Sequence, residues 1–376
     1  MKKISLCVLA LCLCFTFFGV SVFAETAATE APAEEMTAED LYQAGKDALD
    51  AGDYGKAMEY FQAAADLGYS EAIKEIGNMY YFGQGVERDY DKAIECFQRA
   101  ADLGNINAVN NLGLCYLYGT GVEKDEEKAM EYIRTAAEQG NVVAQNNLGY
   151  MYLNGRGVKT DYAEAMKYFR LAAEQGYATA QFNIGNMYRD GLGVKQDYEK
   201  AFHYYHLAAE QEYPGALTAL GYMYGQGLGT EQNPDEMLKY YHLAAEQGET
   251  MAQFNLGCCY RDGFGVEQDY EKMLEYFRLA ADQGNADAQY NLGFAYYIGQ
   301  GVDQDYNEAF RLYQLAADQG FPVAMFAVGD CYYLGNGVEK DLGAAAEWYQ
   351  KSLDAGYVPD EEDQKHLEDV LGKPKD

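Results

Sequence analysis

The feature that most constrains this chain is a repeat with a period of 36 residues. A fixed period of this length is typical of an array of small supersecondary units, each of which buries its apolar face against its neighbours. The 376 residues are therefore expected to form one repeat array rather than several globular domains. Eight glycines at the same position of successive units set the phase: Gly77, Gly113, Gly149, Gly185, Gly221, Gly257, Gly293 and Gly329.

Each unit has the pattern of a helical hairpin. In the unit around Gly149, the apolar residues Leu148 and Tyr152 recur at helical spacing, and a second such stretch follows after a glycine-rich turn. A glycine inside a helix costs about 1 kcal/mol relative to alanine, so Gly149 predicts a close approach of the second helix. We expect small residues of that helix to meet the glycine and its rings to fill the gap to the next unit. The small residues are Ala165, Ala172 and Ala173, and the rings are Tyr168 and Phe169.

The turn between the two helices also has a regular pattern. It begins with Gly155 to Val158, whose glycines suit a chain that leaves a helix through left-handed conformations. Asp161 is a natural N-cap for the second helix. The unit around Gly221 has Asn233 and Pro234 instead, an N-cap residue followed by a proline at the first helical position. Different residues therefore provide the N-cap of the second helix in different units.

This combination of residues resembles the Sel1-like repeat, a relative of the tetratricopeptide repeat with a longer loop. The resemblance extends from Glu71 to about Tyr357 and rests on the pattern A-x-x-x-L-G-x-x-Y-x-x-G-x-G-V-x-x-D-x-x-x-A-x-x-Y-x-x-A-A-x-x-G. It implies an all-α fold, a right-handed α-solenoid of helix-turn-helix repeats, with the first helix of each unit on the concave side. It also implies a role as a scaffold or adaptor for other proteins.

The segments outside the repeats complete the expected organisation. Residues 1–24 have a positive start, an apolar run and small residues near Ala24, which predicts a secretory signal peptide. An uncleaved membrane anchor is the alternative. The remaining segments are a disordered acidic linker over 25–38, a tetratricopeptide-like capping hairpin over 39–69, eight repeats of 36 residues over 70–357, and a C-terminal capping helix and tail over 358–376.

The charge of the chain excludes one class of partner. The formal net charge is -32, and cleavage after Ala24 would remove two lysines and no acid, which takes it to -34. Such a chain repels phosphate backbones and anionic head groups. We therefore expect no nucleic-acid partner and no membrane insertion after cleavage, and a basic or neutral polymer is favoured.

The concave side is the expected ligand-binding face. If the first helices line it, residues one helical turn apart form three rows across successive units, with asparagines beside them. Asparagine can both donate to and accept from a peptide backbone, and aromatic residues are enriched where partners bind. The predicted ligand-binding residues are Asn111, Asn147, Tyr150, Phe182, Asn183, Asn186, Arg189, Phe254, Asn255, Arg261, Tyr290, Asn291, Phe294, Tyr297, Phe326 and Tyr333.

Each kind of predicted residue has a structural alternative. The asparagines can bond to neighbouring helices, and the aromatic rings can pack between units. Arg189 and Arg261 can bind a ligand carboxylate, but ordinary ion pairs with the adjacent Asp190 and Asp262 explain them equally well.

No catalytic residue, metal site or cofactor is predicted. Ser70 and Ser352 are the only serines after the signal segment, and neither has a histidine at an equivalent or nearby position. His203, His206 and His242 could converge on zinc. Arginine or glutamine stands at the equivalent position of other units, however, which favours a solvated outer face.

The cysteines after the signal segment do not recur once per unit, so no disulfide framework is expected. Cys115, Cys259 and Cys331 occupy a position that holds methionine in other units. This pattern predicts buried thiols that pack in the core.

These features together predict an exported, non-catalytic scaffold, periplasmic or extracellular, that binds a protein or extended peptide in its concave groove. The alternative is a glycan-binding or peptidoglycan-binding module, since aromatic faces also stack on sugars. Its mark would be solvent-exposed parallel rings around Tyr290, Tyr297 and Tyr333. A monomer is favoured, and the sequence does not determine the oligomeric state.

Overall fold

The computed structural model describes residues 36–372, apart from the side chain of Glu362. Within this range the chain forms nineteen α-helices and no strand. The predicted signal peptide and most of the predicted linker lie outside the described residues. The first helix begins at Ala38, which is the last residue assigned to the linker from the sequence.

The helices follow one another as antiparallel pairs, with a single helix at the C-terminal end of the described chain. The first helices of the pairs are α1 (Ala38–Asp50), α3 (Ser70–Phe82), α5 (Ile106–Tyr118), α7 (Val142–Asn154), α9 (Ala178–Asp190), α11 (Pro214–Gln226), α13 (Thr250–Asp262), α15 (Ala286–Ile298) and α17 (Pro322–Leu334). The second helices are α2 (Tyr54–Asp66), α4 (Tyr90–Asp102), α6 (Glu126–Glu138), α8 (Tyr162–Glu174), α10 (Tyr198–Ala209), α12 (Pro234–Glu246), α14 (Tyr270–Asp282), α16 (Tyr306–Asp318) and α18 (Leu342–Asp354). The single helix is α19 (Glu361–Leu371).

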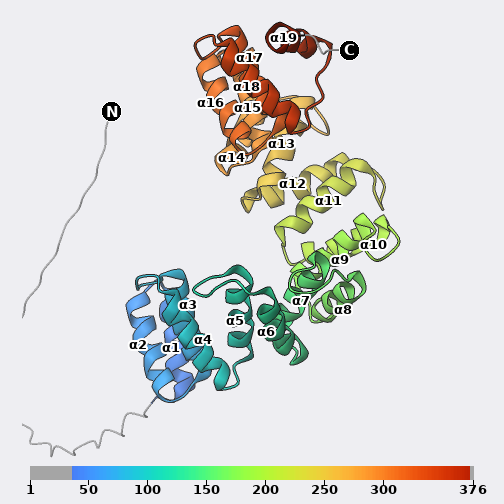
Figure 1. The fold of residues 1–376 in the computed structure, drawn as a ribbon. Helices are drawn as coiled ribbons and strands as arrows, with labels where there is room; N and C mark the ends of the chain where they lie inside the picture. Colours follow the sequence, from blue (N-terminus) through green and yellow to red (C-terminus); the bar gives the residue numbers. More distant parts are fainter. Residues whose placement is uncertain (1–35, 373–376) are drawn as a thin grey trace, which may run out of the picture.

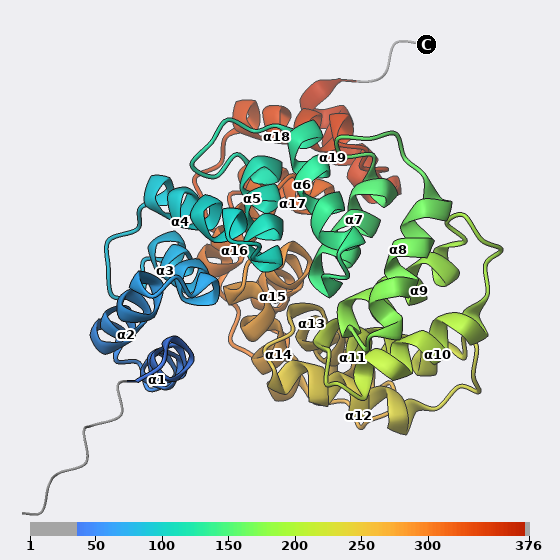
Figure 2. The same cartoon turned by 90° about the horizontal axis from the view of Figure 1, so that it is seen from below.

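The pairs are arranged as a right-handed α-solenoid, which confirms the predicted fold class. They follow a curved path from the blue N-terminal pair to the red C-terminal pair (Figure 1). Seen from below, α11, α13 and α15 lie on the inner side of the curve and their partners α12, α14 and α16 on the outer side (Figure 2). The first helices therefore line the concave side, as the resemblance implied.

The helix ends confirm the predicted capping residues. Asp161 accepts a hydrogen bond from the backbone N–H of Glu164 at 3.1 Å, and Asn233 caps α12 in the same way ahead of Pro234. Gly155 ends α7 in the left-handed region at φ 67°. The local chemistry of each turn thus sets where one helix stops and the next begins.

The glycine inside each first helix contacts a different kind of residue from the one predicted. An added Cβ on Gly149 would lie 2.7 Å from the ring of Phe169 in the second helix. At the equivalent position of the next two repeats, the ring of Tyr205 lies against Gly185 and the ring of Tyr241 against Gly221. The expectation that small residues meet this glycine was wrong. A flat ring covers the bare helix backbone, because the missing side chain leaves space for a ring and not merely for a methyl group.

The two ends of the array differ from its middle. The connection between α1 and α2 is Ala51–Asp53, four residues shorter than the connection Gly83–Asp89 between α3 and α4. At the other end, Leu367 of α19 packs in one cluster with Phe326 and Tyr349. Helix α19 thus covers part of the apolar surface that a further repeat would otherwise bury.

Candidate functional site

The inner face of the solenoid is the candidate site. We define it by the residues of the odd-numbered helices from α3 to α17 that line the concave side, with three rows of residues one helical turn apart. The first row contains Phe182 and its equivalents, the second Tyr222 and its equivalents, and the third Arg189 and its equivalents. The structure assigns these rows different roles.

Three of the predicted asparagines bond to neighbouring repeats. Asn111 donates to Asn78 Oδ1 at 3.3 Å. Asn147 donates to Asn110 Oδ1 at 3.1 Å, and Asn183 donates to Asn146 Oδ1 at 3.0 Å. These amides form a ladder that ties successive inner helices together. Asn111, Asn147 and Asn183 therefore bond to neighbouring helices, which is the alternative to ligand binding that the sequence left open.

Two further predicted asparagines, Asn255 and Asn291, lie beside cavities of the inner face. Asn255 lines a cavity between α9, α11 and α13. Asn291 lines a second cavity and accepts a hydrogen bond from Arg261 Nη1 at 2.7 Å. Its own amide donates to the backbone oxygen of Asp287 at 2.7 Å. Both carboxamides border space that a ligand can enter.

The first row packs largely against other rings. Phe182 has its ring centroid 5.2 Å from that of Tyr213, and Phe254 stacks on Phe277 at 5.8 Å. Tyr290 contacts Phe321 at 5.8 Å.

Phe326 requires a correction within this row. It is 3% exposed and lies between Tyr349 at 4.7 Å and Tyr357 at 4.8 Å. It is a core residue and cannot contact a ligand, because the cap and the last repeat enclose it.

The second row is open to solvent in three repeats. Tyr150, Tyr222 and Phe294 are 43%, 48% and 43% exposed. Asn186 of the same row accepts the hydroxyl proton of Tyr205 at 2.8 Å, so it also supports the core. The outer helices carry a comparable row of exposed leucines, Leu171, Leu243, Leu279 and Leu315, at 39% to 44%. The cavities beside Tyr222 and Phe294, rather than exposure alone, distinguish the inner face.

The third row contains two arginines that are already paired. Arg189 donates through Nε and Nη2 to the two carboxylate oxygens of Asp190, at 2.7 and 2.9 Å. Arg261 makes the same two bonds to Asp262, at 2.7 and 3.0 Å, and these bonds raise the pKa of Arg261 above its usual range. The ion pairs that the sequence left as an alternative are therefore present.

The two tyrosines of the third row also have protein partners. Tyr297 accepts a hydrogen bond from Asn336 Nδ2 at 2.8 Å. Tyr333 donates to Asp369 Oδ2 of α19 at 2.6 Å, and its ring lies 4.6 Å from that of His366. Because α19 engages Tyr333, this residue holds the cap in place.

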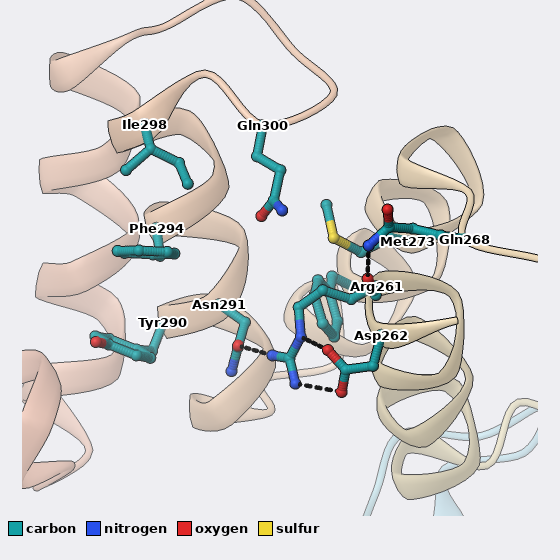
Figure 3. A pocket seen from close by; sticks show the side chains of 10 residues that line it. Arg261, Asp262, Gln268, Met273, Tyr290, Asn291, Phe294, Ile298 and Gln300 are labelled. Carbon is teal, nitrogen blue, oxygen red and sulfur yellow. Dashed lines mark hydrogen bonds and ion pairs between the residues drawn. The ribbon is translucent and has the colours of Figure 1, made fainter. Parts of the chain in front are cut away.

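Two cavities of similar size open on the inner face. One, of about 690 Å³, is lined by Arg261, Asp262, Phe294 and Ile298 among others. Tyr290, Phe294 and Ile298 form a column on α15, opposite Arg261 and Asp262 of α13 (Figure 3). The other, of about 700 Å³, has the equivalent pair Arg189 and Asp190 together with Tyr222 and Met251.

Sequence reasoning did not place Gln196 and Gln268 in the site. Gln196 Nε2 donates to the backbone oxygen of Arg189 at 2.7 Å, and Gln268 does the same for Arg261 at 2.6 Å. Each glutamine thereby fixes the helix end that carries the arginine. Gln232 and Gln304 make the same bond to the residues seven positions before them, so a glutamine that recurs every 36 residues is the signal that could have revealed this role.

The remaining candidate groups pack within the protein. His242 Nδ1 lies 3.2 Å from the hydroxyl of Tyr276 on the outer side. In residues 36–372, no three metal-ligating side chains come together as a candidate site. Cys115, Cys259 and Cys331 are buried, which confirms the prediction of core thiols, and burial raises the pKa of Cys259 to about 12. No described helix combines the length and apolar character needed to cross a bilayer.

Comparison with known proteins identifies the repeat. The family model described as Sel1 repeat matches nine consecutive stretches, 31–69, 70–105, 106–141, 142–177, 178–213, 214–249, 250–285, 286–321 and 322–357. The chain belongs to the Sel1 repeat family. The first stretch covers the short-looped hairpin for which the sequence predicted a tetratricopeptide-like form. Proteins of the Sel1 repeat family generally serve as scaffolds for protein–protein interaction and are typically non-catalytic.

Two solved structures of Sel1-type proteins are similar to this one. The first is c5321, described as a protective antigen present in uropathogenic Escherichia coli strains and displaying an SLR fold. It is 31% identical with a TM-score of 0.63, over 89% of this chain and 75% of that one. The second is a Sel1 repeat protein from Oxalobacter formigenes, 32% identical with a TM-score of 0.59, over 83% of this chain and 90% of that one. No curated protein matches the chain significantly.

Proposed function

We propose that this Sel1 repeat protein is an exported, non-catalytic scaffold that binds an extended segment of another protein along its inner face. The observation that carries the proposal is the row of exposed apolar residues beside the two cavities. Tyr222 borders one cavity and Phe294 the other, and both are exposed although they lie on helices that are otherwise well packed. Contacts of aromatic side chains with a partner are a common source of binding energy.

The glycan alternative lacks its expected mark in this structure. Tyr290 packs on Tyr313 and Phe321, and Tyr297 meets Tyr306 edge-on at 5.1 Å. Tyr333 is engaged by the cap. These three rings do not form an exposed parallel set on which a sugar could stack.

The export part of the proposal rests on the sequence alone. The segment that carries it, residues 1–24, lies outside the described residues. Expression of the full chain with mass determination of the product tests it: cleavage after Ala24 is expected, and a product that keeps Lys2 and Lys3 in the membrane fraction would favour the anchor instead.

Peptide binding can be tested by selecting a displayed random-peptide library on residues 25–376. Selected peptides are then titrated against the wild-type chain and against an inner variant carrying Tyr222→Ser and Phe294→Ser. The expected result is at least tenfold weaker binding to the inner variant, because two large contact residues are lost.

A matched control uses apolar residues of similar exposure on the outer helices. Leu243 of α12 and Leu279 of α14 are 41% and 44% exposed. The outer variant with Leu243→Ser and Leu279→Ser should bind the selected peptides as the wild type does. Equal binding of the peptides to all three proteins would contradict the proposal.

A further inference from the structure

From α5 to α17 the inner helices are almost free of charge in a chain whose net charge is -32, whereas α3 carries Glu71, Lys74 and Glu75. On the first helices from α5 to α17, the charged residues are Arg189, Asp190, Arg261, Asp262, Asp287 and Asp330. The outer helices differ. The 13 residues of α6 alone include Glu126, Glu127, Glu131 and Glu138. The acidic character of the chain therefore belongs mainly to the outer helices and the turns.

The cation of each cavity is held by a neighbouring anion. The guanidinium of Arg261 uses Nε and Nη2 on Asp262 and Nη1 on Asn291. Arg189 is bound by both oxygens of Asp190 and lies beside Tyr205. A two-point pair of this kind is among the stronger charge-assisted contacts. A ligand carboxylate would have to displace the aspartate to reach the arginine, and would gain little net energy.

The one further carboxylate that lines these cavities is also hydrogen-bonded within the protein. Glu249, which lines the cavity between α9, α11 and α13, is the N-cap of α13. It accepts from the backbone N–H of Ala252 at 2.6 Å and from the hydroxyl of Thr218 at 3.0 Å. A ligand cation would compete with both bonds. Neither sign of charge has a prepared, unengaged partner at these cavities.

The rest of the cavity lining is apolar or carries carboxamides. Tyr222, Met251 and Asn255 line one cavity, and Phe294 and Asn291 line the other. Rings and aliphatic chains accept apolar side chains, and the carboxamide of Asn255 can both donate to and accept from a peptide bond. The carboxamide of Asn291 already accepts from Arg261 and donates to the backbone oxygen of Asp287. This combination complements a segment that has apolar side chains and no charge of its own.

We infer that the occupant of the inner face is an uncharged, extended segment of a partner protein, with apolar side chains in the cavities beside Tyr222 and Phe294. The inference rests on the proposed function and specifies its ligand. The net charge alone favoured either a basic or a neutral partner, and the inner face favours the neutral one. The acidic outer side then sets solubility and long-range repulsion, and takes no part in recognition.

Salt dependence of binding distinguishes the two kinds of partner. Contacts between uncharged groups are not screened, whereas contacts with a basic segment weaken as salt rises. For the peptides selected on wild-type residues 25–376, the segment that contacts the inner face should contain no Lys, Arg, Asp or Glu. The Kd should change by less than about twofold between about 50 and about 500 mM NaCl.

Two variants test the role assigned to the arginines. Arg189→Gln with Arg261→Gln should bind the same peptides within about threefold of wild type, because the arginines engage their own aspartates. Asp190→Asn with Asp262→Asn removes the negative charge that balances each guanidinium group. Selection on this second variant should favour peptides with carboxylates, and their affinity should fall about tenfold over the same salt range.

The outcomes separate this inference from the proposed function. Selected peptides that depend on Tyr222 and Phe294 but contain charged contact residues, and that lose binding tenfold in salt or on Arg→Gln substitution, would overturn the inference and leave the function standing. Peptides that bind the inner variant as well as wild type would overturn both. Circular dichroism of each variant confirms that the helices are retained before binding is compared.

Discussion

Two glycines with positive φ are required for different reasons. Gly157 has φ 66°, and a Cβ added there would overlap the backbone oxygen of Glu126 in the preceding repeat. Gly176 has φ 84°, and nothing lies within 4 Å of its added Cβ. The first glycine therefore serves both conformation and packing, and the second serves conformation alone.

Substitution of these two glycines by alanine should separate the two effects. Gly176→Ala should lower the free energy of unfolding by about 1 kcal/mol, the usual cost of a left-handed residue with a Cβ. Gly157→Ala should cost about 3 kcal/mol or more, because the backbones of two repeats must also move apart. Urea unfolding followed by circular dichroism measures both. Equal losses for the two variants would show that the inter-repeat contact at Gly157 has no energetic weight.

Glu212 is the only non-glycine residue with a positive φ in the described part of the chain, at 57°. It stands where Gly176 and Gly248 close neighbouring repeats, and it closes the turn in the same way, with its N–H donating to Ala209 O at 2.9 Å. The backbone conformation of the turn is therefore kept although the residue is unsuited to it.

Glu212→Gly should stabilise the protein by about 1 kcal/mol, because it removes the left-handed strain of a side-chain-bearing residue. Glu210→Gly provides the control: Glu210 has φ -60°, so glycine there should destabilise by about 0.5 to 1 kcal/mol. Thermal unfolding of both variants measures the difference. A loss of stability in Glu212→Gly would mean that the side chain makes a contact that outweighs the strain.

At the scale of elements, α19 is tied to the last repeat through polar groups. Asp330 of α17 accepts from Tyr349 Oη and from His366 Nδ1 of α19, both at 2.8 Å. Burial raises the pKa of the Asp330 carboxyl above its usual range, although both of these bonds act in the opposite direction. Asp363 and Asp369 of α19 bond to Tyr357 and Tyr333. The cap is thus docked by carboxylates that face tyrosines and a histidine.

The raised pKa of Asp330 predicts a pH dependence of stability. The folded chain holds this proton more tightly than the unfolded chain, so the contribution is fully present below the unfolded pKa and is lost as pH rises through the folded pKa. Asp330→Asn removes this titration. The variant should therefore lose less stability than wild type as pH rises above about 4, the ordinary pKa of an aspartate.

Urea midpoints at several pH values measure this effect. Asp354→Asn, at the exposed end of α18, controls for the removal of one negative charge without a buried carboxyl. Hydrogen exchange of residues 361–371 reports whether the cap itself responds. If the Asp330→Asn and wild-type profiles run parallel, burial of this carboxyl does not govern the docking of α19.

At the scale of the whole molecule, excess negative charge opposes the compact state. The net charge of -32 gathers on outer helices and turns, where like charges repel along the array. Salt shortens the Debye length from about 30 Å at 0.01 M to about 8 Å at 0.15 M. Repulsion between repeats is therefore expected to fall sharply over this range.

The thermal midpoint should accordingly rise by several degrees between about 0.01 M and about 0.15 M NaCl. A variant with Glu127→Gln, Glu131→Gln, Glu275→Gln and Glu347→Gln, all on exposed positions of outer helices, should show a smaller rise. Differential scanning calorimetry measures both. A midpoint that does not move with salt would show that the acids are locally compensated and do not repel across repeats.

The sequence by itself determined the repeat, the helix pairs and their ends. These depend on local requirements: helical spacing of apolar residues such as Leu148 and Tyr152, an N-cap such as Asp161, and a left-handed glycine such as Gly155. Each requirement is met by residues of a single repeat. Because the same residues recur in successive repeats, the helix pairs can be predicted without knowing the contacts between repeats.

Only the tertiary structure decided which inner-face residues are open to a partner. Phe326 is enclosed by Tyr349 and Tyr357, and Asn147 bonds to Asn110 of the preceding repeat, whereas Phe294 remains exposed. The family pattern treats equivalent positions alike. The exposure of a residue depends on the side chains that the second helix of its own repeat and the adjacent repeats bring against it, and those side chains change from unit to unit.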